Sequence, residues 1–591
     1  MFKKISLFLA IVMLLTSAAA CASNSNTGGG TAATTTTAAA TTTAAPATTT
    51  TAAAETTTAA KANANKLVKD PRANDPFIAP IVNEPVTLSL GVSQSTNVLD
   101  YEDNYVTKWY EEKTGIHVKY ELFPSSDAVT RLDLLVNSNS ELPDILTFGL
   151  DHVRRFNYGK EGVLIPLDEY YEYLGEPFFK YAESVGVKGE DVLRFIISAD
   201  GKLYGAPFFD YNYNNLYSLR AWMNKTWLDK LGLEVPTNSE ELITVLTAFR
   251  DQDPNGNNQA DEIPMMGNTR AWNSNALGYL MNMFIYYNGN NNYYQPLNET
   301  GGKIDVAYDK DAYREFLKYA NKLVADGLLS PLSFTQDAAQ YNATKSASPP
   351  ILGLSIAGGA NEFYLNQNDD EYIPFEALKG PAGKQYYTTF PPSAYSSCAI
   401  TKYCDSPEIA FLYMNFTYYS DEAYEGQLSK RFGEKDVDWR YALPGEESFH
   451  PGMPPFLHVI QTQWGVPNNK NIAGVWLSNV IDPHKLFEVF DGSTSNPEYW
   501  YARNYTINKD HGIPFDQLPV IFRYTEDEIA KWADKRAALQ EFVTESMTLF
   551  AMGQMDPKND GDWNKYLQEL NNLQYKDIIA TDQAAFERGR K

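Results

Sequence analysis

The first regular pattern in the chain is the alternation of apolar and polar side chains in VTLSLGV, at residues 86–92. This period of two predicts a β-strand. The next stretch, DNYVTKWYEEKTG, has helical spacing and stops at Gly115, and a second strand is expected over His117–Phe123. A helix near Ala128–Asn137 then leads to LPDILTFGL, the third predicted strand. This order of strands and helices is typical of a parallel α/β sheet.

A second helical pattern lies in the middle of the chain. WLDKLG predicts a short helix that ends at Gly232, and PTNSEELITVLTAF predicts a longer one. Thr237 with Glu240 three positions later is a capping-box pattern, so this helix is expected to begin at Thr237. Its buried face is predicted from the apolar positions Leu242, Val245, Leu246 and Phe249. The polar stretch DQDPNGNNQADEIP, residues 251–264, therefore follows a helix that is packed in a core.

The N-terminus has the pattern of an export signal. Lys3 and Lys4 precede the apolar run ISLFLAIVMLL, which is too short for a permanent membrane span. The small residues that run into Cys21 resemble a bacterial lipoprotein signal over residues 1–21, with Cys21 as the lipidated residue. Ala18 stands where such signals usually have Leu, and ordinary cleavage near Ala20–Ala22 is the alternative. Either form of cleavage predicts an exported protein.

A long segment of low complexity follows this signal. Residues 22–81 are rich in Thr and Ala and contain few large apolar side chains, so they cannot offset the entropy cost of ordering. We expect a disordered linker with a root-mean-square span of about 40 Å for some 50 residues. Such a tether suits a folded body, residues 82–591, that is held at a membrane by a lipid on Cys21.

Charge and cysteine content narrow the class of protein. The chain of 591 residues has a formal net charge of −25, which argues against nucleic acid as a partner because phosphate binding needs a basic surface. Its length predicts more than one packed unit. Cys398 and Cys404 are about 20 Å apart on an extended strand, so a disulfide between them would need a tight bend. We interpret them as buried thiols.

The polar stretch at residues 251–264 has the composition of a calcium loop. Calcium takes six to eight oxygen ligands, and odd spacing directs successive side chains inward. One register starts at Asp251, as in an EF-hand, with Gly256 at position 6 and Glu262 at position 12. The other starts at Asp253 and uses Asp253, Asn255, Asn257, the carbonyl of Gln259, Asp261 and Glu262. A solvated Asn-Gly turn is the alternative without a metal.

Enzyme signatures are absent from the sequence. It contains no G-x-S-x-G, H-E-x-x-H, P-loop or C-x-x-C motif, and its six histidines are scattered. Pairs of carboxylates can act in hydrolysis, but their distance in space is not readable from spacing. We therefore expect a binding protein that is not an enzyme and has no catalytic residues.

Seven stretches, in order, resemble family 1 extracellular solute-binding proteins of carbohydrate ABC transporters, especially the large lipoproteins of Gram-positive bacteria. They are WYEEKTGIHV, LPDILTF, GVLIPLDEYY, DGKLYGAPF, WMNKTWLDKLGLEVPTNSEEL, DPNGNNQADEIP and CDSPEIAFLYMNF. The resemblance implies an α/β, two-lobe periplasmic-binding-protein-like fold of type II, with the lobes joined by a multi-strand hinge. It places lobe one at about residues 82–205 and 385–435, and lobe two at about 206–384 and 436–591.

The resemblance also implies a function. An oligosaccharide would be bound between the lobes of a monomer and delivered to the permease subunits of an ABC transporter, at the extracellular face of the cell membrane. Similarity to alginate-binding members favours the loop register that starts at Asp253, with a structural Ca²⁺. A non-sugar solute such as a peptide is the alternative ligand, and a tethered polysaccharide-degrading enzyme is the third interpretation.

Candidate ligand-binding residues follow from sugar chemistry. Sugar rings stack on aromatic faces, and their hydroxyl groups bond to a few placed polar groups. The stretches FFDYNYNN, NTRAWNSN, PPSAYSS and QTQWGVPNN combine both kinds of side chain, and they supply Asp210, Tyr211, Tyr213, Arg270, Trp272, Tyr395 and Trp464. For each aromatic residue alone, packing in a core is the competing interpretation. Trp222 and Trp227 are predicted to be core residues.

Overall fold

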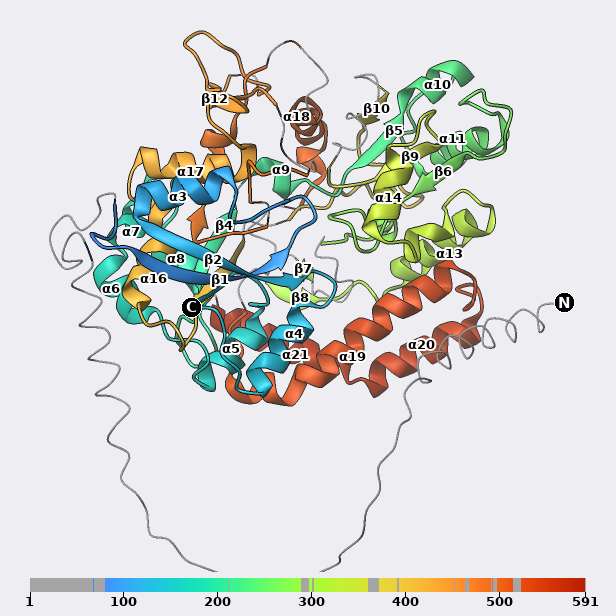
Figure 1. Cartoon of the computed structure of the whole chain (residues 1–591). Coiled ribbons are helices and arrows are strands. Elements are labelled where there is room, and N and C mark those ends of the chain that lie inside the picture. Colours follow the sequence, from blue (N-terminus) through green and yellow to red (C-terminus); the bar gives the residue numbers. More distant parts are fainter. Residues whose placement is uncertain are drawn as a thin grey trace, which may run out of the picture. The chain divides into compact units, whose positions relative to one another are not determined.

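The structure is a computed structural model of the chain (Figure 1). It describes residue 67 and residues 80–589, apart from 211, 289–296, 300–301, 360–370, 391–392, 451, 462, 464–466, 473, 491, 493–496 and 514–521. The predicted signal, Cys21 and the predicted linker up to residue 66 lie outside the described residues. In the described part of the chain, no helix combines the length and apolar character that crossing a bilayer requires.

The first sheet has six strands in the order β14-β4-β11-β3-β1-β2. The first three predicted strands lie in it side by side: β1 pairs in parallel with both β2 and β3, so the parallel α/β prediction is confirmed. β4 and β14 are parallel to each other, while β11 runs antiparallel to β3 and β4. The strands are β1 (Val86–Gln94), β2 (Ile116–Pro124), β3 (Ile145–Leu146), β4 (Ala206–Asp210), β11 (Ser393–Ile400) and β14 (Asn479–Val480).

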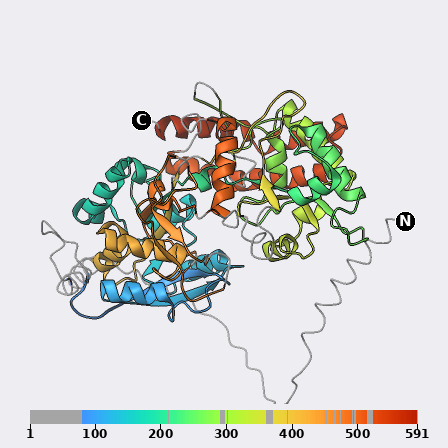
Figure 2. The same ribbon diagram turned by 90° about the horizontal axis from the view of Figure 1, so that it is seen from above.

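Eight helices belong with this sheet in the described part of the chain, and β1 and β2 (blue) lie beside α3 and α17 in both views (Figure 1, Figure 2). α3 ends where Gly115 adopts the left-handed conformation, with φ of 75°, as the sequence predicts. The helices are α3 (Tyr105–Thr114), α4 (Ala128–Asn137), α5 (His152–Lys160), α6 (Asp168–Leu174), α7 (Glu176–Ser184), α8 (Gly189–Arg194), α16 (Pro407–Met414) and α17 (Asp421–Phe432). A hairpin of β12 (Trp439–Tyr441) and β13 (Leu457–Val459) completes this half.

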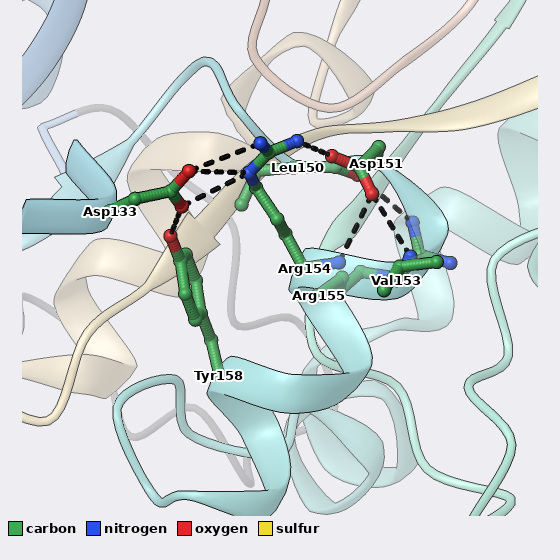
Figure 3. A network of polar contacts seen from close by, with 7 residues as sticks. All are labelled: Asp133, Leu150, Asp151, Val153, Arg154, Arg155 and Tyr158. Atoms are coloured by element: carbon green, nitrogen blue, oxygen red, sulfur yellow. Dashed lines mark hydrogen bonds and ion pairs between the residues drawn. The ribbon is translucent and has the colours of Figure 1, made fainter. Parts of the chain in front are cut away.

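A polar network fixes α5 against α4 (Figure 3). Asp151 caps α5 by accepting hydrogen bonds from the backbone N–H groups of Val153 and Arg154, at 3.0 and 3.1 Å. The guanidinium of Arg154 also binds Asp133 on α4, at 3.0 Å, and the hydroxyl of Tyr158 donates to the same carboxylate. Burial acts to raise the pKa of Asp133, but these two donors outweigh it and lower the pKa. The network therefore acts as a structural clamp.

The second sheet has four strands in the order β10-β5-β9-β6. β6 is parallel to β9, whereas β5 is antiparallel to both β9 and β10. The predicted core residues Trp222 and Trp227 are confirmed, because both are fully buried here. The strands are β5 (Ala221–Asn224), β6 (Ile263–Met266), β9 (Leu352–Ile356) and β10 (Tyr372–Pro374), and a small separate pair is formed by β7 (Leu297–Glu299) and β8 (Lys303–Asp305).

Helices from the middle of the chain and from its C-terminal part pack with the second sheet. The long C-terminal helix α19 lies beside α13, and both contribute to one core with Met223 and Leu354 from the sheet and Phe249 from a neighbouring helix. The helices are α9 (Tyr213–Leu216), α10 (Lys225–Leu231), α11 (Ser239–Asp251), α12 (Ala276–Met281), α13 (Asp311–Ala325), α14 (Ala338–Lys345), α18 (Pro497–Asn508), α19 (Glu526–Ala551), α20 (Asp560–Asn572) and α21 (Tyr575–Gly589).

The chain passes between the two sheets three times. β4 is followed by β5, β10 by β11, and β14 by α18, whose Trp500 packs in one cluster with Trp222 of β5. We call the connecting segments, residues 211–220, 375–392 and 481–496, the first, second and third crossings. The sequence predicts that the second lobe begins at residue 206 and resumes at residue 436. Strand pairing instead puts β4 and β14 in the first sheet, because their hydrogen bonds go to β11 and to each other.

Two local predictions differ in outcome. The N-cap of helix α11 is one residue later than predicted: Asn238, not Thr237, accepts from the N–H groups of Glu240 and Glu241. The backbone N–H and hydroxyl of Thr237 instead bond to the carboxylate of Glu241, at 2.8 Å each. Cys398 and Cys404 are both free thiols, as interpreted from the sequence, although Cys404 is half-buried.

Candidate ligand site at the strand crossings

The first crossing runs from the end of β4 in the first sheet to the edge of the second sheet where β6 and β9 end. β6 and β9 are parallel, so their carboxyl ends lie at one edge of the second sheet. Residue 221 at the start of β5 pairs with residue 356 at the end of β9, so the first crossing enters at that same edge. β4 ends at Asp210, where this crossing begins. Ligands of open α/β sheets bind outside the carboxyl ends of strands.

Asp210 and Tyr395 lie on neighbouring strands of the first sheet, close to where the first crossing begins. In the register of β4 and β11, Asp210 faces Ser393 and Phe208 faces Tyr395. The rings of Phe208 and Tyr395 stack with centroids 5.2 Å apart, and Trp476 meets the same Phe208 edge-on at 5.2 Å. Tyr395 nevertheless keeps 48% of its surface exposed. An exposed aromatic ring with a supported rear face is a suitable platform for a sugar ring.

The carboxylate of Asp210 is held by the first crossing. It accepts a hydrogen bond from the backbone N–H of Asn212 at 2.8 Å and another from the side-chain amide of Asn215. Desolvation by burial raises the pKa of Asp210, and the positive charge of Arg431 acts in the opposite direction. The two hydrogen bonds fix the orientation of this carboxylate.

Trp272 is an exposed aromatic side chain near the carboxyl ends of β6 and β9, with 53% of its surface accessible. It lies in the loop between β6 and α12, and its ring rests on Gly358, just beyond the end of β9. A Cβ atom on Gly358 would lie 2.6 Å from Cε3 of Trp272, so only glycine leaves room for the ring. The backbone N–H of Gly358 donates to the carbonyl of Trp272 at 3.2 Å.

A short chain of hydrogen bonds joins these two parts of the site. From Asp210 it passes to Asn215, whose carbonyl accepts from the hydroxyl of Ser218 at 2.8 Å. The same hydroxyl accepts from the side-chain amide of Asn273 at 2.6 Å, and Asn273 follows Trp272 directly in the chain. The structure thus links the predicted residues Asp210, Tyr395 and Trp272 around the first crossing.

The other predicted ligand-binding residues are not linked to Asp210 by the contacts described above. Arg270 is exposed in the loop of Trp272, with its backbone N–H bonded to the side chain of Asn268 at 2.7 Å. Tyr213 begins α9, and Tyr211 and Trp464 lie outside the described residues. Sequence reasoning missed Phe208, Trp476 and Arg431. Phe208 lies two positions before the predicted Asp210, but no local pattern marked the other two.

The predicted metal loop lies at the opposite end of β6 from Trp272. The carboxylate of Asp253, a residue with φ of 44°, accepts from the backbone N–H groups of Gly256, Asn257 and Asn258 at 2.9–3.1 Å. The amides of Asn255 and Asn257 donate to Asp261 at 3.0–3.1 Å. Oxygen-bearing side chains of the loop therefore face one another.

Two observations bear on whether this loop suits a cation. Oε1 of Glu262 is buried and accepts no hydrogen bond, and burial raises the pKa of its carboxyl, helped by the charges of Asp253 and Asp261. A bound cation would satisfy that oxygen, so the donor set fits calcium. Asp251 instead forms an ion pair with Arg250 at 2.7 Å. Within the described residues, His, Cys, Asp and Glu side chains form no group of three that could hold a metal by themselves.

Two sheets with their own helices, linked by three crossings, define a two-lobe α/β fold of type II. The family model for bacterial extracellular solute-binding protein matches residues 94–424. The chain therefore belongs to this family. A second model, the New glue protein family, matches residues 1–76, in the Thr- and Ala-rich N-terminal part of the chain.

Curated relatives are similar over part of the chain. The fructooligosaccharide ABC transporter substrate-binding protein FusA of Streptococcus pneumoniae serotype 4 is 28% identical over 294 residues, which are 49% of this chain and 52% of FusA. Lipoprotein LipO of Bacillus subtilis strain 168 is 24% identical over 302 residues, 49% of this chain and 54% of LipO. The chain thus spans about half the length of the curated relatives it matches.

Solved structures share the fold over most of the chain. FusA in complex with kestose superposes with a TM-score of 0.70 at 20% identity, covering 86% of this chain and 99% of FusA. An EF-hand mutant of FusA with fructo-nystose gives 0.68 at 21% identity, with the same coverage. The alginate-binding protein AlgQ2 without calcium ion gives 0.64 at 17% identity, also with 86% and 99% covered.

Proposed function

We propose that this protein captures an oligosaccharide at the first crossing and delivers it to the permease of an ABC importer. The observation that carries the proposal is a pair of exposed rings near the fixed carboxylate of Asp210: Tyr395 lies on the neighbouring strand, and Trp272 is linked to Asp210 by the chain of hydrogen bonds. Two stacking faces and a placed hydrogen-bond acceptor match the apolar faces and hydroxyl groups of a chain of sugar rings. Membership of the solute-binding family and the similarity to FusA support the same ligand class.

Isothermal titration of the folded protein with an oligosaccharide panel tests this function. The panel should include kestose, larger fructo-oligosaccharides, pectin fragments, malto-oligosaccharides and peptides. One sugar is expected to bind with micromolar or tighter affinity. Heat from peptides alone would instead support the non-sugar solute-binding alternative.

Variants of the two rings locate the site. Trp272→Ala and Tyr395→Ala should each weaken sugar binding about tenfold or more, because each removes a stacking face worth about 1–2 kcal/mol. Leu443→Ala is the matched control, since Leu443 is 58% exposed on the segment between β12 and β13. Equal affinities in all three variants would place the ligand elsewhere.

A sugar-cleaving activity is the competing function, and it is tested by the products. Incubation of the protein with the bound sugar should return that sugar unchanged in chromatography. Shortened products that disappear in Asp210→Asn would identify an enzyme instead.

We also propose that the loop from Asp253 to Glu262 holds a structural calcium ion. The unsatisfied oxygen of Glu262 and the inward-facing Asp253 and Asp261 support the register that starts at Asp253. In this register Asp253, Asn255, Asn257, Gln259, Asp261 and Glu262 would hold the ion. The ion would neutralise the carboxylates and fix the connection between α11 and β6. The EF-hand named for FusA and the calcium ion named for AlgQ2 support a calcium ion in this loop, in either register.

Melting curves test the calcium proposal. Calcium added to chelator-treated protein should raise the melting temperature, since a ligand of the native state alone adds about 2.7 kcal/mol at a hundredfold excess over its Kd. Asp253→Asn should reduce this rise. Asp251→Asn is the control. Because Asp251 is paired with Arg250, this variant should leave the rise in melting temperature intact. A calcium response lost in Asp251→Asn and kept in Asp253→Asn would establish the other register.

Attachment of the protein to the cell surface is proposed from the sequence. A lipid on Cys21 would hold the body at the extracellular face of the membrane, and the solute-binding family supports an extracellular location. Cell fractionation checks this anchor: the wild type should sediment with membranes, and Cys21→Ala should appear in the medium. We also propose that the protein is a monomer. Light scattering of the Cys21→Ala protein should then give the mass of one chain.

A further inference from the structure

The first and third crossings meet at one buried side chain. Asn214 lies in α9, on the first crossing, and Glu498 lies in the first turn of α18, directly after the third crossing. The amide nitrogen Nδ2 of Asn214 donates to both carboxyl oxygens of Glu498, at 2.8 and 2.7 Å. Glu498 is buried, so this contact is shielded from water. Hydrogen bonds between buried groups hold their geometry because breaking them leaves a polar atom unsatisfied.

Arg220 extends this contact to the edge of the second sheet. Its side chain is fully buried at the end of the first crossing, next to β5. One terminal nitrogen donates to the carbonyl of Asn214 at 2.6 Å, and the other donates to the carbonyl of Gly358. The guanidinium also lies over the ring of Tyr501 on α18, 4.2 Å from its centroid. One arginine therefore contacts the first crossing, the backbone just beyond β9, and α18, the helix that follows the third crossing.

Gly358 is the residue on which Trp272 rests. Its carbonyl is bound by Arg220, while its N–H bonds to Trp272 and its Cα supports the ring. A displacement of the carbonyl of Gly358 must therefore move the surface beneath the exposed indole. The path from Glu498 to Trp272 consists of direct contacts throughout.

We propose that Glu498, Asn214 and Arg220 form a positioning joint that ties the first and third crossings together and sets the place of Trp272. None of the three is proposed to touch the ligand. The joint rests on the proposed function in one respect: its value for binding depends on Trp272 being a sugar platform. Its structural part, the coupling from Glu498 to Trp272, holds for any ligand.

Fluorine NMR on the full-length protein tests this coupling without a ligand. Incorporated 5-fluorotryptophan reports each indole, and the resonance missing from Trp272→Phe identifies Trp272. Asn214→Ala and Glu498→Ala are expected to shift that resonance. Glu498→Gln should leave it in place, because glutamine keeps an acceptor oxygen for Asn214. Titration with the sugar that binds the wild type should show about tenfold weaker binding in the two alanine variants and near-normal binding in Glu498→Gln.

A matched control separates positioning from general loss of stability. Asp582 is a buried carboxylate among the C-terminal helices, where it accepts from Tyr524 at 2.9 Å. Asp582→Asn should lower the melting temperature but leave the Trp272 resonance unmoved. If the alanine variants fold and their Trp272 resonance stays at the wild-type position, the joint does not exist. If the wild type binds no sugar, the proposed function fails, while the NMR result still decides the joint.

Asn214→Ser is a milder variant for the case in which alanine prevents folding. A serine hydroxyl is too short to reach both oxygens of Glu498, so the resonance of Trp272 should shift in the same direction by a smaller amount. An unmoved resonance in this variant would also overturn the proposal.

Discussion

At the scale of the residue, burial decides the charge of several side chains. Desolvation raises the pKa of Glu498 to about 8, so its carboxyl carries a proton at neutral pH. Burial lowers the pKa of Lys430 to about 7, where its ammonium lies over the ring of Tyr110 at 4.5 Å. These two groups make the free energy of unfolding depend on pH in opposite directions.

Glu498 gives a pH prediction with a definite sign. Its pKa is raised in the native state, so the native state binds more protons than the unfolded state between about pH 4.5 and 8. Stability should therefore be full below this range and decrease as pH rises through about 8, at most by about 1.4 kcal/mol per unit of the pKa difference. Glu498→Gln removes this decrease, whereas Lys430 contributes equally to both proteins. Urea unfolding at pH 5.5 and 8.5 measures the difference, and equal pH dependence in both proteins would contradict the assignment.

At the scale of the element, the site depends on how three short segments end. β4 delivers Asp210, β9 ends next to Gly358, and the loop after β6 delivers Trp272. The ring can approach the backbone of β9 closely because Gly358 has no side chain. The proposed metal loop lies at the other end of β6, so the length of this strand separates it from the proposed ligand residues.

Gly358 offers a test at this scale with a natural control beside it. In Gly358→Ala the new methyl group would meet the ring of Trp272 at 2.6 Å, so the ring must move and sugar affinity should fall about tenfold. In Gly359→Ala the nearest atom, the hydroxyl oxygen of Tyr501, is 3.7 Å away, which is ordinary contact. Titration calorimetry of the two variants compares them. Equal affinity would show that the support of Trp272 by Gly358 has no role in binding.

At the scale of the whole molecule, three crossings join two separately packed sheets. The cores are formed by different residues: Leu88, Ile145 and Val480 pack in the first, and Met223 and Leu354 in the second. Few chain segments link the two, which is the arrangement that permits hinge motion. We expect the bound sugar to draw the two lobes together.

Small-angle X-ray scattering measures this closure. The radius of gyration should decrease when saturating sugar is added to the folded body, residues 82–591, and should not change with a sugar that gives no heat in calorimetry. Trp272→Ala should need a higher sugar concentration for the same decrease. An unchanged radius at full occupancy would exclude closure as the response to the ligand.

Much of the local structure was determined by the sequence itself. The alternation in Val86–Val92 and the left-handed stop at Gly115 depend on neighbours in the chain, and both are found in the structure. The chemistry of sugar binding placed Asp210, Tyr395 and Trp272 on one list of candidates. The cap of α11 was misplaced by one residue because Thr237 and Asn238 are both good caps, and the backbone geometry chose the second.

Only the tertiary structure decided which of these residues meet. Asn214 and Glu498 are 284 positions apart, and β14 joins the first sheet although its neighbours in sequence led to the second lobe. Contacts of this kind depend on how the crossings return between two sheets, and they leave no periodicity in the sequence. The sequence by itself determined the elements and the chemical types of the candidate residues. Their convergence at the first crossing depended on strand pairing and burial between distant segments.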